Sequence, residues 1–260
     1  MTTTLNNRGF CWYELMTTDT KAALAFYTEV IGWKTQPFME AGQGMEYTMW
    51  VGPNGPLGGL MTLPEPARQM GAPPHWLAYV SVDDLKSMTA QAETLGARIL
   101  VPITEIPNGG AFCVFMDPSG GVCGLHSSNE PMPARDLTQS KEGEVCWHEY
   151  MYTTDDALNF YRQLFGWQNT DSMDMGPMGT YQMFNRGEGT QTIGGSMKAP
   201  PGVPTCWGYY VEVGDLKAAT ERLTRLGGKV INGPMEVPGG EIVNCLDPQG
   251  AAFSLHGAKR

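Results

Sequence analysis

Two short segments place a carboxylate two residues after a tryptophan, at Trp12-x-Glu14 and Trp147-x-Glu149. Both segments have the apolar character of a strand, and side chains two residues apart on a strand share a face. A carboxylate beside a tryptophan on a partly buried face loses hydration, which raises its pKa and suits it to general acid or base chemistry. Glu14 and Glu149 are therefore the candidate catalytic residues. The alternative is structural: each glutamate forms a buried hydrogen bond to a backbone or arginine group.

The histidines offer a second candidate chemistry. His126 and His256 each follow a leucine at the end of an apolar run. Such a histidine is either a base that faces a ligand or a packing residue that hydrogen-bonds a turn. A metal site formed by His148, Glu149 and His256 is disfavoured, because His148 and Glu149 are neighbours on opposite faces of one strand.

These candidates recur because the chain repeats itself in order, at an offset of about 130 to 136 residues. This offset is far longer than a solenoid period and predicts two duplicated, fused domains. We place the domains at 1–127 and 144–260, joined by a polar, proline-containing linker at 128–143. The recurring segments are Cys11–Asp19 and Cys146–Thr154, Phe26-Tyr27 and Phe160-Tyr161, Gly32-Trp33 and Gly166-Trp167, Gly58-Gly59 and Gly194-Gly195, Trp76 and Trp207, and Asp117–Gly120 and Asp247–Gly250.

Composition narrows the classes of partner. The 260 residues are 42% hydrophobic and 17% charged, with a net charge of −10. This acidic balance argues against nucleic acid or an anionic membrane as a partner, and no apolar run approaches the roughly 18–20 residues of a membrane span. The N-terminus lacks the features of a signal peptide, and the six cysteines form no CxxC pair. We therefore expect a cytoplasmic protein with mostly buried thiols and no structural zinc site.

Apolar spacing predicts four amphipathic helices, each ended by a glycine: Gly32, Gly96, Gly166 and Gly227. Their expected core positions are Ala23, Phe26, Tyr27, Val30 and Ile31; Leu85, Met88, Ala92 and Leu95; Leu158, Tyr161, Leu164 and Phe165; and Leu216, Ala219, Leu223 and Leu226. Strand-like runs surround these helices in the order β-α-β-β-β, twice in each half. This order predicts an α+β fold of four modules, with helices outside a curved sheet. We expect Asp117 and Asp247, which open Asp-Pro-x-Gly turns, to be structural.

The Trp-x-Glu strand, the Phe-Tyr helix ending in Gly-Trp, the Gly-Gly pair and the Asp-Pro-x-Gly turn resemble the vicinal oxygen chelate superfamily. That superfamily includes glyoxalase I, bleomycin-resistance proteins and extradiol dioxygenases, and the resemblance extends from about residue 9 to 257. The chain is most similar to tandem glyoxalase-like proteins of bacteria, including a mycobacterial antigen group. The resemblance implies two tandem glyoxalase-like domains, each a cup-shaped open barrel built from two βαβββ modules.

The resemblance also implies a divalent metal, held by His, Glu or Gln at four strand positions. The matching residues here are Trp12, Leu60 or Met61, Leu77 and Gly124 in the first half, and Trp147, Ser196 or Met197, Gly208 and Ser254 in the second. These side chains are not a ligand set for a hard cation, so we expect no metal and no other cofactor. The expected ligand contacts are Trp12, Leu77, His126, Trp147, Gly208, Ser254 and His256.

Three functional hypotheses follow. The first is a metal-independent protein that binds a small organic molecule in a Trp- and Glu-lined cup. The second is a lyase, isomerase or hydrolase that uses Glu14 or Glu149 as a general base. The third is a metal-dependent enzyme of the glyoxalase or dioxygenase type, with a divalent metal held by relocated ligands. In each case the partner is a small molecule, and the protein is a monomer or a homodimer.

Overall fold

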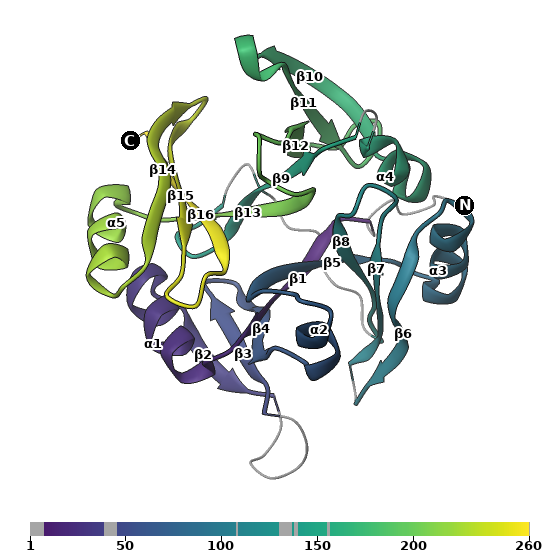
Figure 1. Ribbon diagram of the computed structural model, residues 1–260, viewed down its shortest axis with the longest axis horizontal. Helices are drawn as coiled ribbons and strands as arrows, with labels where there is room; N and C mark the ends of the chain where they lie inside the picture. The colour runs from purple at the N-terminus through teal and green to yellow at the C-terminus, as the bar shows by residue number, and fades with distance from the viewer. Residues whose placement is uncertain are drawn as a thin grey trace. The chain divides into compact units, whose positions relative to one another are not determined.

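The computed structural model describes residues 8–38, 46–107, 109–129, 137, 140–154 and 157–259. Its elements follow the order of one strand, one helix and three strands four times (Figure 1). This order confirms the four βαβββ modules and the α+β class that the sequence predicts.

The first half contains two of these modules. The first module consists of β1 (Phe10–Thr17), α1 (Thr20–Ile31), β2 (Lys34–Pro37), β3 (Thr48–Gly52) and β4 (Gly55–Thr62). A short helix that the sequence did not predict, α2 (Glu65–Gln69), follows it. The second module consists of β5 (His75–Ser81), α3 (Leu85–Thr94), β6 (Arg98–Ile106), β7 (Gly110–Met116) and β8 (Val122–Ser127).

The second half repeats this arrangement. The third module consists of β9 (Val145–Tyr152), α4 (Leu158–Phe165), β10 (Gln168–Asp174), the short 3-10 helix η2 (Gly176–Met178), β11 (Thr180–Asn185) and β12 (Thr192–Lys198). The fourth consists of β13 (Cys206–Glu212), α5 (Leu216–Arg225), β14 (Lys229–Val237), β15 (Gly240–Leu246) and β16 (Ala252–Ala258).

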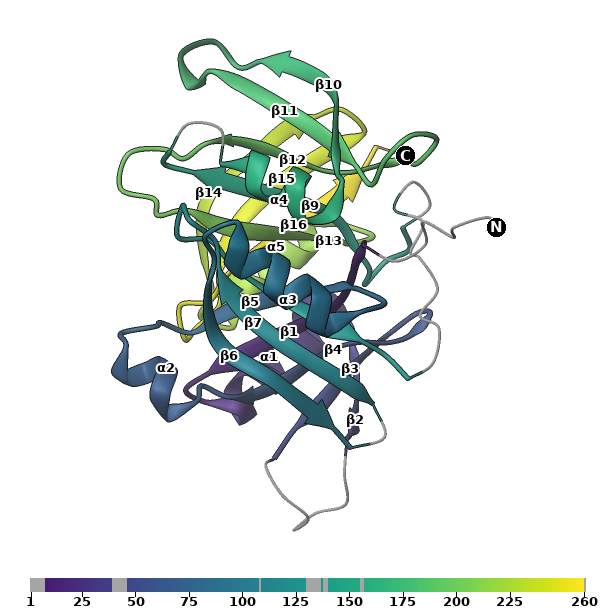
Figure 2. The same ribbon diagram turned by 90° about the vertical axis from the view of Figure 1, so that its right-hand side faces the viewer.

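Each half forms an open eight-stranded sheet. The strand order is β2-β3-β4-β1-β5-β8-β7-β6 in the first half and β10-β11-β12-β9-β13-β16-β15-β14 in the second. The first and last strands of each module pair in parallel, as β1 does with β4 and β13 with β16. Figure 2 shows α3 lying against β6 and β7, which is the expected layer of helix on sheet. The same order in both halves confirms two tandem glyoxalase-like domains.

Packing groups the modules differently from the sequence. One compact unit, unit 1, takes the described residues of Met1–Cys11, Ala78–Thr138 and Trp147–Gly208. Unit 2 takes those of Trp12–Leu77, Gln139–Cys146 and Tyr209–Arg260. Each unit therefore combines most of one module from each half. The domain boundaries at 127 and 144 stay a prediction, and most of the expected linker, 130–136 with 138 and 139, lies outside the described residues.

The helices bury the faces that their spacing predicts. The buried residues of α1 are the five expected, Ala23, Phe26, Tyr27, Val30 and Ile31. Asp19 Oδ1 caps this helix by accepting a hydrogen bond of 3.0 Å from Ala22 N, and Gly32 ends it with a φ of 89°. Leu95 and Leu226 depart from the pattern. Each is the C-cap that follows the last helical residue, of α3 and α5 respectively; Leu95 is only partly buried, and Leu226 is 37% exposed.

Strand β4 contains Gly55, Gly58 and Gly59, a residue type with a low strand propensity. A Cβ at Gly58 would lie 1.9 Å from Tyr13 O on the paired strand β1, so only glycine fits there.

The expected structural role of the two Asp-Pro-x-Gly turns is confirmed, since the Oδ1 atom of each turn aspartate accepts two backbone hydrogen bonds. They come from Ser119 and Gly121 to Asp117, at 2.7 and 3.1 Å, and from Gln249 and Ala251 to Asp247, at 2.9 and 2.8 Å.

Two further expectations concern thiols and membranes. The six cysteines form no disulfide, and only Cys146 and Cys206 are partly exposed. No helix among the described residues has the length and apolar character needed to cross a membrane.

Candidate functional site

The first candidate site lies within unit 2, on β1 and on the residue before β3. Trp12 Nε1 donates a hydrogen bond of 2.8 Å to the Tyr47 hydroxyl, and this hydroxyl donates one of 2.8 Å to Glu14 Oε1. Trp12 is half-buried, and Glu14 is only 8% exposed. We call these three residues the first array. The alternation of the strand predicted the shared face of Trp12 and Glu14, and the structure adds the tyrosine that joins them.

The second half builds the same arrangement within unit 1. Trp147 Nε1 donates a hydrogen bond of 2.7 Å to the Tyr181 hydroxyl, which is also hydrogen-bonded to Glu149. We call Trp147, Tyr181 and Glu149 the second array. Gly208 lies beside it, since a Cβ there would be 3.8 Å from Glu149 O.

The second glycine of each Gly-Gly pair makes room for the tyrosine. A Cβ on Gly59 would lie 1.9 Å from the Tyr47 hydroxyl, and one on Gly195 would lie 2.1 Å from Cε1 of Tyr181. The rings of Tyr47 and Tyr181 therefore pack directly on the backbone of Gly59 and Gly195, on the neighbouring strand. Sequence reasoning missed both tyrosines, although Tyr-x-Met recurs at 47–49 and 181–183 and marks them.

Burial keeps both phenols protonated. It raises the pKa of Tyr47 well above the usual range, and the charge of Glu14 raises that pKa further. Burial and the charge of Glu149 raise the pKa of Tyr181 in the same way. Each array therefore combines a partly exposed indole with a carboxylate that accepts the single hydrogen bond of a protonated phenol. Such a surface is suited to a flat molecule with polar groups at its edge.

Two histidines form contacts inside unit 1. His126 Nε2 lies 3.2 Å from Gly109 O, and its buried Nδ1 has no partner among the described residues. Burial lowers the pKa of His126, so the ring is neutral at physiological pH. His148 is 2% exposed, stacks on Phe10, and has Nδ1 2.7 Å from Ile193 O. His148 and Glu149 thus have separate partners, and in the described part of the chain they do not form a metal cluster.

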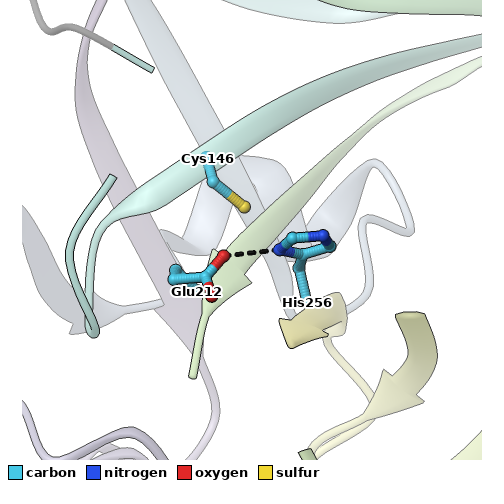
Figure 3. Close-up of side chains that lie close together, drawn as sticks. All are labelled: Cys146, Glu212 and His256. Atoms are coloured by element: carbon cyan, nitrogen blue, oxygen red, sulfur yellow. Dashed lines mark hydrogen bonds and ion pairs between the residues drawn. The ribbon is translucent and has the colours of Figure 1, made fainter. Parts of the chain in front are cut away.

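His256 belongs to a group that the sequence did not predict. Its Nδ1 lies 2.5 Å from Glu212 Oε2, and Cys146 Sγ completes a cluster whose ligand atoms all lie within 4.8 Å of one another (Figure 3). Burial raises the pKa of the Cys146 thiol, and the charge of Glu212 raises it further. A nucleophilic cysteine needs a lowered pKa, so this cluster is not an activated thiol.

The remaining predicted contacts are placed as follows. Leu77 is 1% exposed and belongs to the core of unit 2. Ser254 Oγ donates a hydrogen bond of 2.8 Å to Asn244 Oδ1 on the neighbouring strand. The units divide the predicted site: Trp12, Glu14, Leu77, Ser254 and His256 lie in unit 2, and His126, Trp147, Glu149 and Gly208 lie in unit 1. Their functional roles stay predictions.

Comparison with known proteins by sequence identifies one superfamily and relatives that match nearly the whole chain. The chain matches the family model of the Glyoxalase/Bleomycin resistance protein/Dioxygenase superfamily at residues 9–122 and 153–255. It is 31% identical over 247 residues to "Putative glyoxylase CFP32" of Mycobacterium tuberculosis, covering 94% of this chain and 92% of that protein. It is 28% identical over 260 residues to "Anthracycline biosynthesis protein DauV" of Streptomyces sp. (strain C5), covering 94% and 91%.

Solved structures show the same fold at low identity. The 2,3-dioxygenase LapB from Pseudomonas sp. KL28 is 12% identical, with a TM-score of 0.67 over 98% of this chain and 94% of that chain. The Mn(II)-bound glyoxalase from Novosphingobium aromaticivorans is 15% identical, with a TM-score of 0.64 over 97% and 82%. At these identities the likeness concerns the fold alone.

Proposed function

The chain belongs to the Glyoxalase/Bleomycin resistance protein/Dioxygenase superfamily, and we propose that its two arrays bind a small organic molecule without the usual metal of that family. The observation that carries this proposal is the Trp–Tyr–Glu hydrogen-bonded chain, which occurs in both halves. The carboxylate is buried in the first array and partly exposed in the second. A carboxylate fixed by a phenol beside a partly exposed indole suits recognition of a polar, flat ligand.

The donor set at the family's metal positions supports binding without a metal there. Trp12, Leu77 and Gly124 offer no side-chain oxygen, imidazole or thiolate, and in the second half the Ser254 hydroxyl is already hydrogen-bonded to Asn244. Divalent cations of this class prefer carboxylate, imidazole and thiolate ligands. These residues do not fit a metal, and the proposed function assigns no step to one.

The chemistry of the arrays indicates a class of ligand. The indole of Trp12 offers a flat apolar surface, and the Glu14 carboxylate accepts a hydrogen bond from a hydroxyl or amine. A planar, hydroxylated aromatic compound combines both features. The names of two Streptomyces relatives, which are anthracycline biosynthesis proteins, make polycyclic aromatic compounds a sensible first library.

The ligand test is a thermal-shift screen followed by titration of intrinsic tryptophan fluorescence. A ligand at about 100 times its Kd stabilises the native state by about 2.7 kcal/mol, which a thermal shift detects readily. We expect Glu14→Gln and Tyr47→Phe to weaken binding at the first array, and Glu149→Gln and Tyr181→Phe at the second. Each pair serves as the control for the other half. The proposal fails if a hit binds the Glu14→Gln, Glu149→Gln double variant as tightly as the unaltered protein.

A second candidate function is catalysis with Glu14 or Glu149 as a general base in a lyase, isomerase or hydrolase. The specific observation in its favour is the burial of Glu14 against a protonated phenol, whose hydrogen bond fixes the carboxylate in a poorly hydrated position. Turnover of each hit separates the two functions. Retained binding with lost turnover in Glu14→Gln or Glu149→Gln favours the enzyme, and no turnover of any hit favours the binding protein.

A further inference from the structure

Three potential metal ligands meet at the ends of three strands in unit 2. Cys146 lies on β9, Glu212 on β13 and His256 on β16, and their side chains point toward one another (Figure 3). A ligand atom from each lies within 4.8 Å of the other two, and all three residues are only partly exposed. Among the described residues this is the one group of three or more such side chains that approach so closely.

The backbone holds two of the three side chains in place. Glu212 and His256 are direct partners in the parallel pairing of β13 with β16. Glu212 Oε1 accepts a hydrogen bond of 3.2 Å from Ala258 N, which leaves Oε2 directed at His256 Nδ1, 2.5 Å away. The side chains of His256 and Glu212 are 19% and 12% exposed, so a small ion can reach them.

The first half provides an internal comparison. There Ser81 and His126 are the matching partners on β5 and β8, and Cys11 Sγ donates to Tyr79 O at 3.3 Å, as Cys146 Sγ does to Tyr210 O at 3.4 Å. The first half therefore has the cysteine and the histidine without the carboxylate. Replacement of this serine by Glu212 is what creates the cluster in the second half.

We propose that Cys146 Sγ, Glu212 Oε2 and His256 Nδ1 bind one Zn²⁺, with a fourth position open to water or to another ligand. Sulfur, imidazole nitrogen and carboxylate oxygen are the three donor types that zinc takes in proteins. Bond lengths of about 2.0–2.3 Å in a tetrahedral site place the ligand atoms about 3.3–3.8 Å apart. The 2.5 Å contact between Nδ1 and Oε2 needs to open by about 1 Å, which a side-chain rotation supplies.

This site is distinct from the positions that the family uses. Cys146 precedes Trp147, Glu212 follows Gly208 by four residues, and His256 follows Ser254 by two. Binding converts the neutral thiol into a thiolate, whose charge together with that of Glu212 balances the two charges of the cation. The site therefore goes beyond the proposed ligand binding at the arrays.

The test titrates chelator-treated full-length protein with Zn²⁺ in competition with a chromophoric chelator, and with Co²⁺ as a spectroscopic probe. We expect one equivalent of Zn²⁺ and a sulfur-to-cobalt charge-transfer band. Cys146→Ser should abolish the band. Loss of a residue that only supports a metal ligand typically weakens metal binding by roughly 10–100-fold. Because Glu212 is proposed as a direct ligand, Glu212→Ser should weaken zinc binding by more than this. Cys206→Ser removes the other partly exposed thiol and should change neither result.

Glu212→Ser is also the folding control, because it reproduces the Ser81–His126 pairing that the first half already has. Its far-ultraviolet circular dichroism and urea midpoint show whether a loss of zinc binding is local. The proposal is overturned if the unaltered protein binds no zinc, or if the folded Glu212→Ser and Cys146→Ser variants bind it as tightly. Glu14→Gln should retain full zinc binding, so failure of ligand binding at the arrays and failure of this site are separate results.

Discussion

The Tyr27 hydroxyl on α1 donates a hydrogen bond of 3.1 Å to Asp247 Oδ2, although the two residues are 220 positions apart. The corresponding tyrosine of the second half, Tyr161, donates one of 2.7 Å to Asp117 Oδ2. Each half thus supplies the helix tyrosine for the turn aspartate of the other half, and each pair lies inside one compact unit. This exchange gives the recurring Phe-Tyr and Asp-Pro-x-Gly segments a common structural role.

The first prediction concerns the two tyrosines. Tyr27→Phe leaves Asp247 Oδ2 without its phenol donor and should lower the free energy of unfolding by about 1–3 kcal/mol. Tyr161→Phe should cost less, because the Tyr150 hydroxyl still donates to Asp117 Oδ2 at 2.6 Å. Both variants also remove the acceptor of a tryptophan, Trp76 or Trp207, so this loss cancels in the comparison. Urea unfolding measures both values, and an equal or greater loss in Tyr161→Phe contradicts the prediction.

The second prediction concerns the pH dependence of stability. Burial raises the pKa of Asp247, although hydrogen bonds from its turn and from Tyr27 oppose this effect. The folded pKa then exceeds the unfolded value of about 3.9, so the native state binds the proton more tightly. The stability that this group contributes is complete below pH 3.9 or so and is lost as pH rises through the folded pKa.

Asp247→Asn removes this titration, and the comparison cancels the other acidic groups. We expect the free energy of unfolding of the unaltered protein, minus that of the variant, to fall as pH rises above about 4. Urea unfolding at several pH values gives the difference directly. A difference that grows with pH would mean that the carboxylate is favoured by the fold.

The third prediction concerns Gly59. Ala at this position places a Cβ 1.9 Å from the Tyr47 hydroxyl, so Gly59→Ala should destabilise the protein by about 1–3 kcal/mol. The cost should fall sharply in a Tyr47→Ala background, because the clashing ring is then absent. A double-mutant cycle measures this coupling, and Gly195→Ala with Tyr181→Ala repeats it in the second half. Additive costs in both halves would exclude the packing that we describe.

The fourth prediction compares the loss of stability when two buried tryptophans, Trp50 and Trp33, are each replaced by phenylalanine. Trp50 Nε1 has no hydrogen-bond partner among the described residues. In the second half the corresponding residue is Phe184, which follows Tyr181 by three residues as Trp50 follows Tyr47. Trp50→Phe removes an unsatisfied donor along with some volume, so we expect a net cost of about 1 kcal/mol or less. Trp33 Nε1 instead donates to Gly143 O at 2.7 Å, and Trp33→Phe should cost about 1–3 kcal/mol more. Urea unfolding of the two variants under one condition tests the order.

Local patterns predicted much of the fold. The five buried positions of α1 follow from helical spacing, and Gly32 follows from the need for a left-handed residue at the helix end. The pairing of Trp12 with Glu14 follows from the alternation of a strand. Strand propensity does not account for Gly58 and Gly59 of β4, because close contacts with other strands require glycine there.

The sequence by itself determined the duplication, the four modules, the helix faces and the two Trp-x-Glu segments. All of these depend on periodicity within about a dozen neighbouring residues or on direct comparison of the halves. The tertiary structure alone decided that Tyr47 joins Trp12 to Glu14, that Tyr27 binds Asp247, and that Cys146, Glu212 and His256 meet. Such contacts depend on strand order and register between distant segments, which the periodicity of a single strand or helix does not encode.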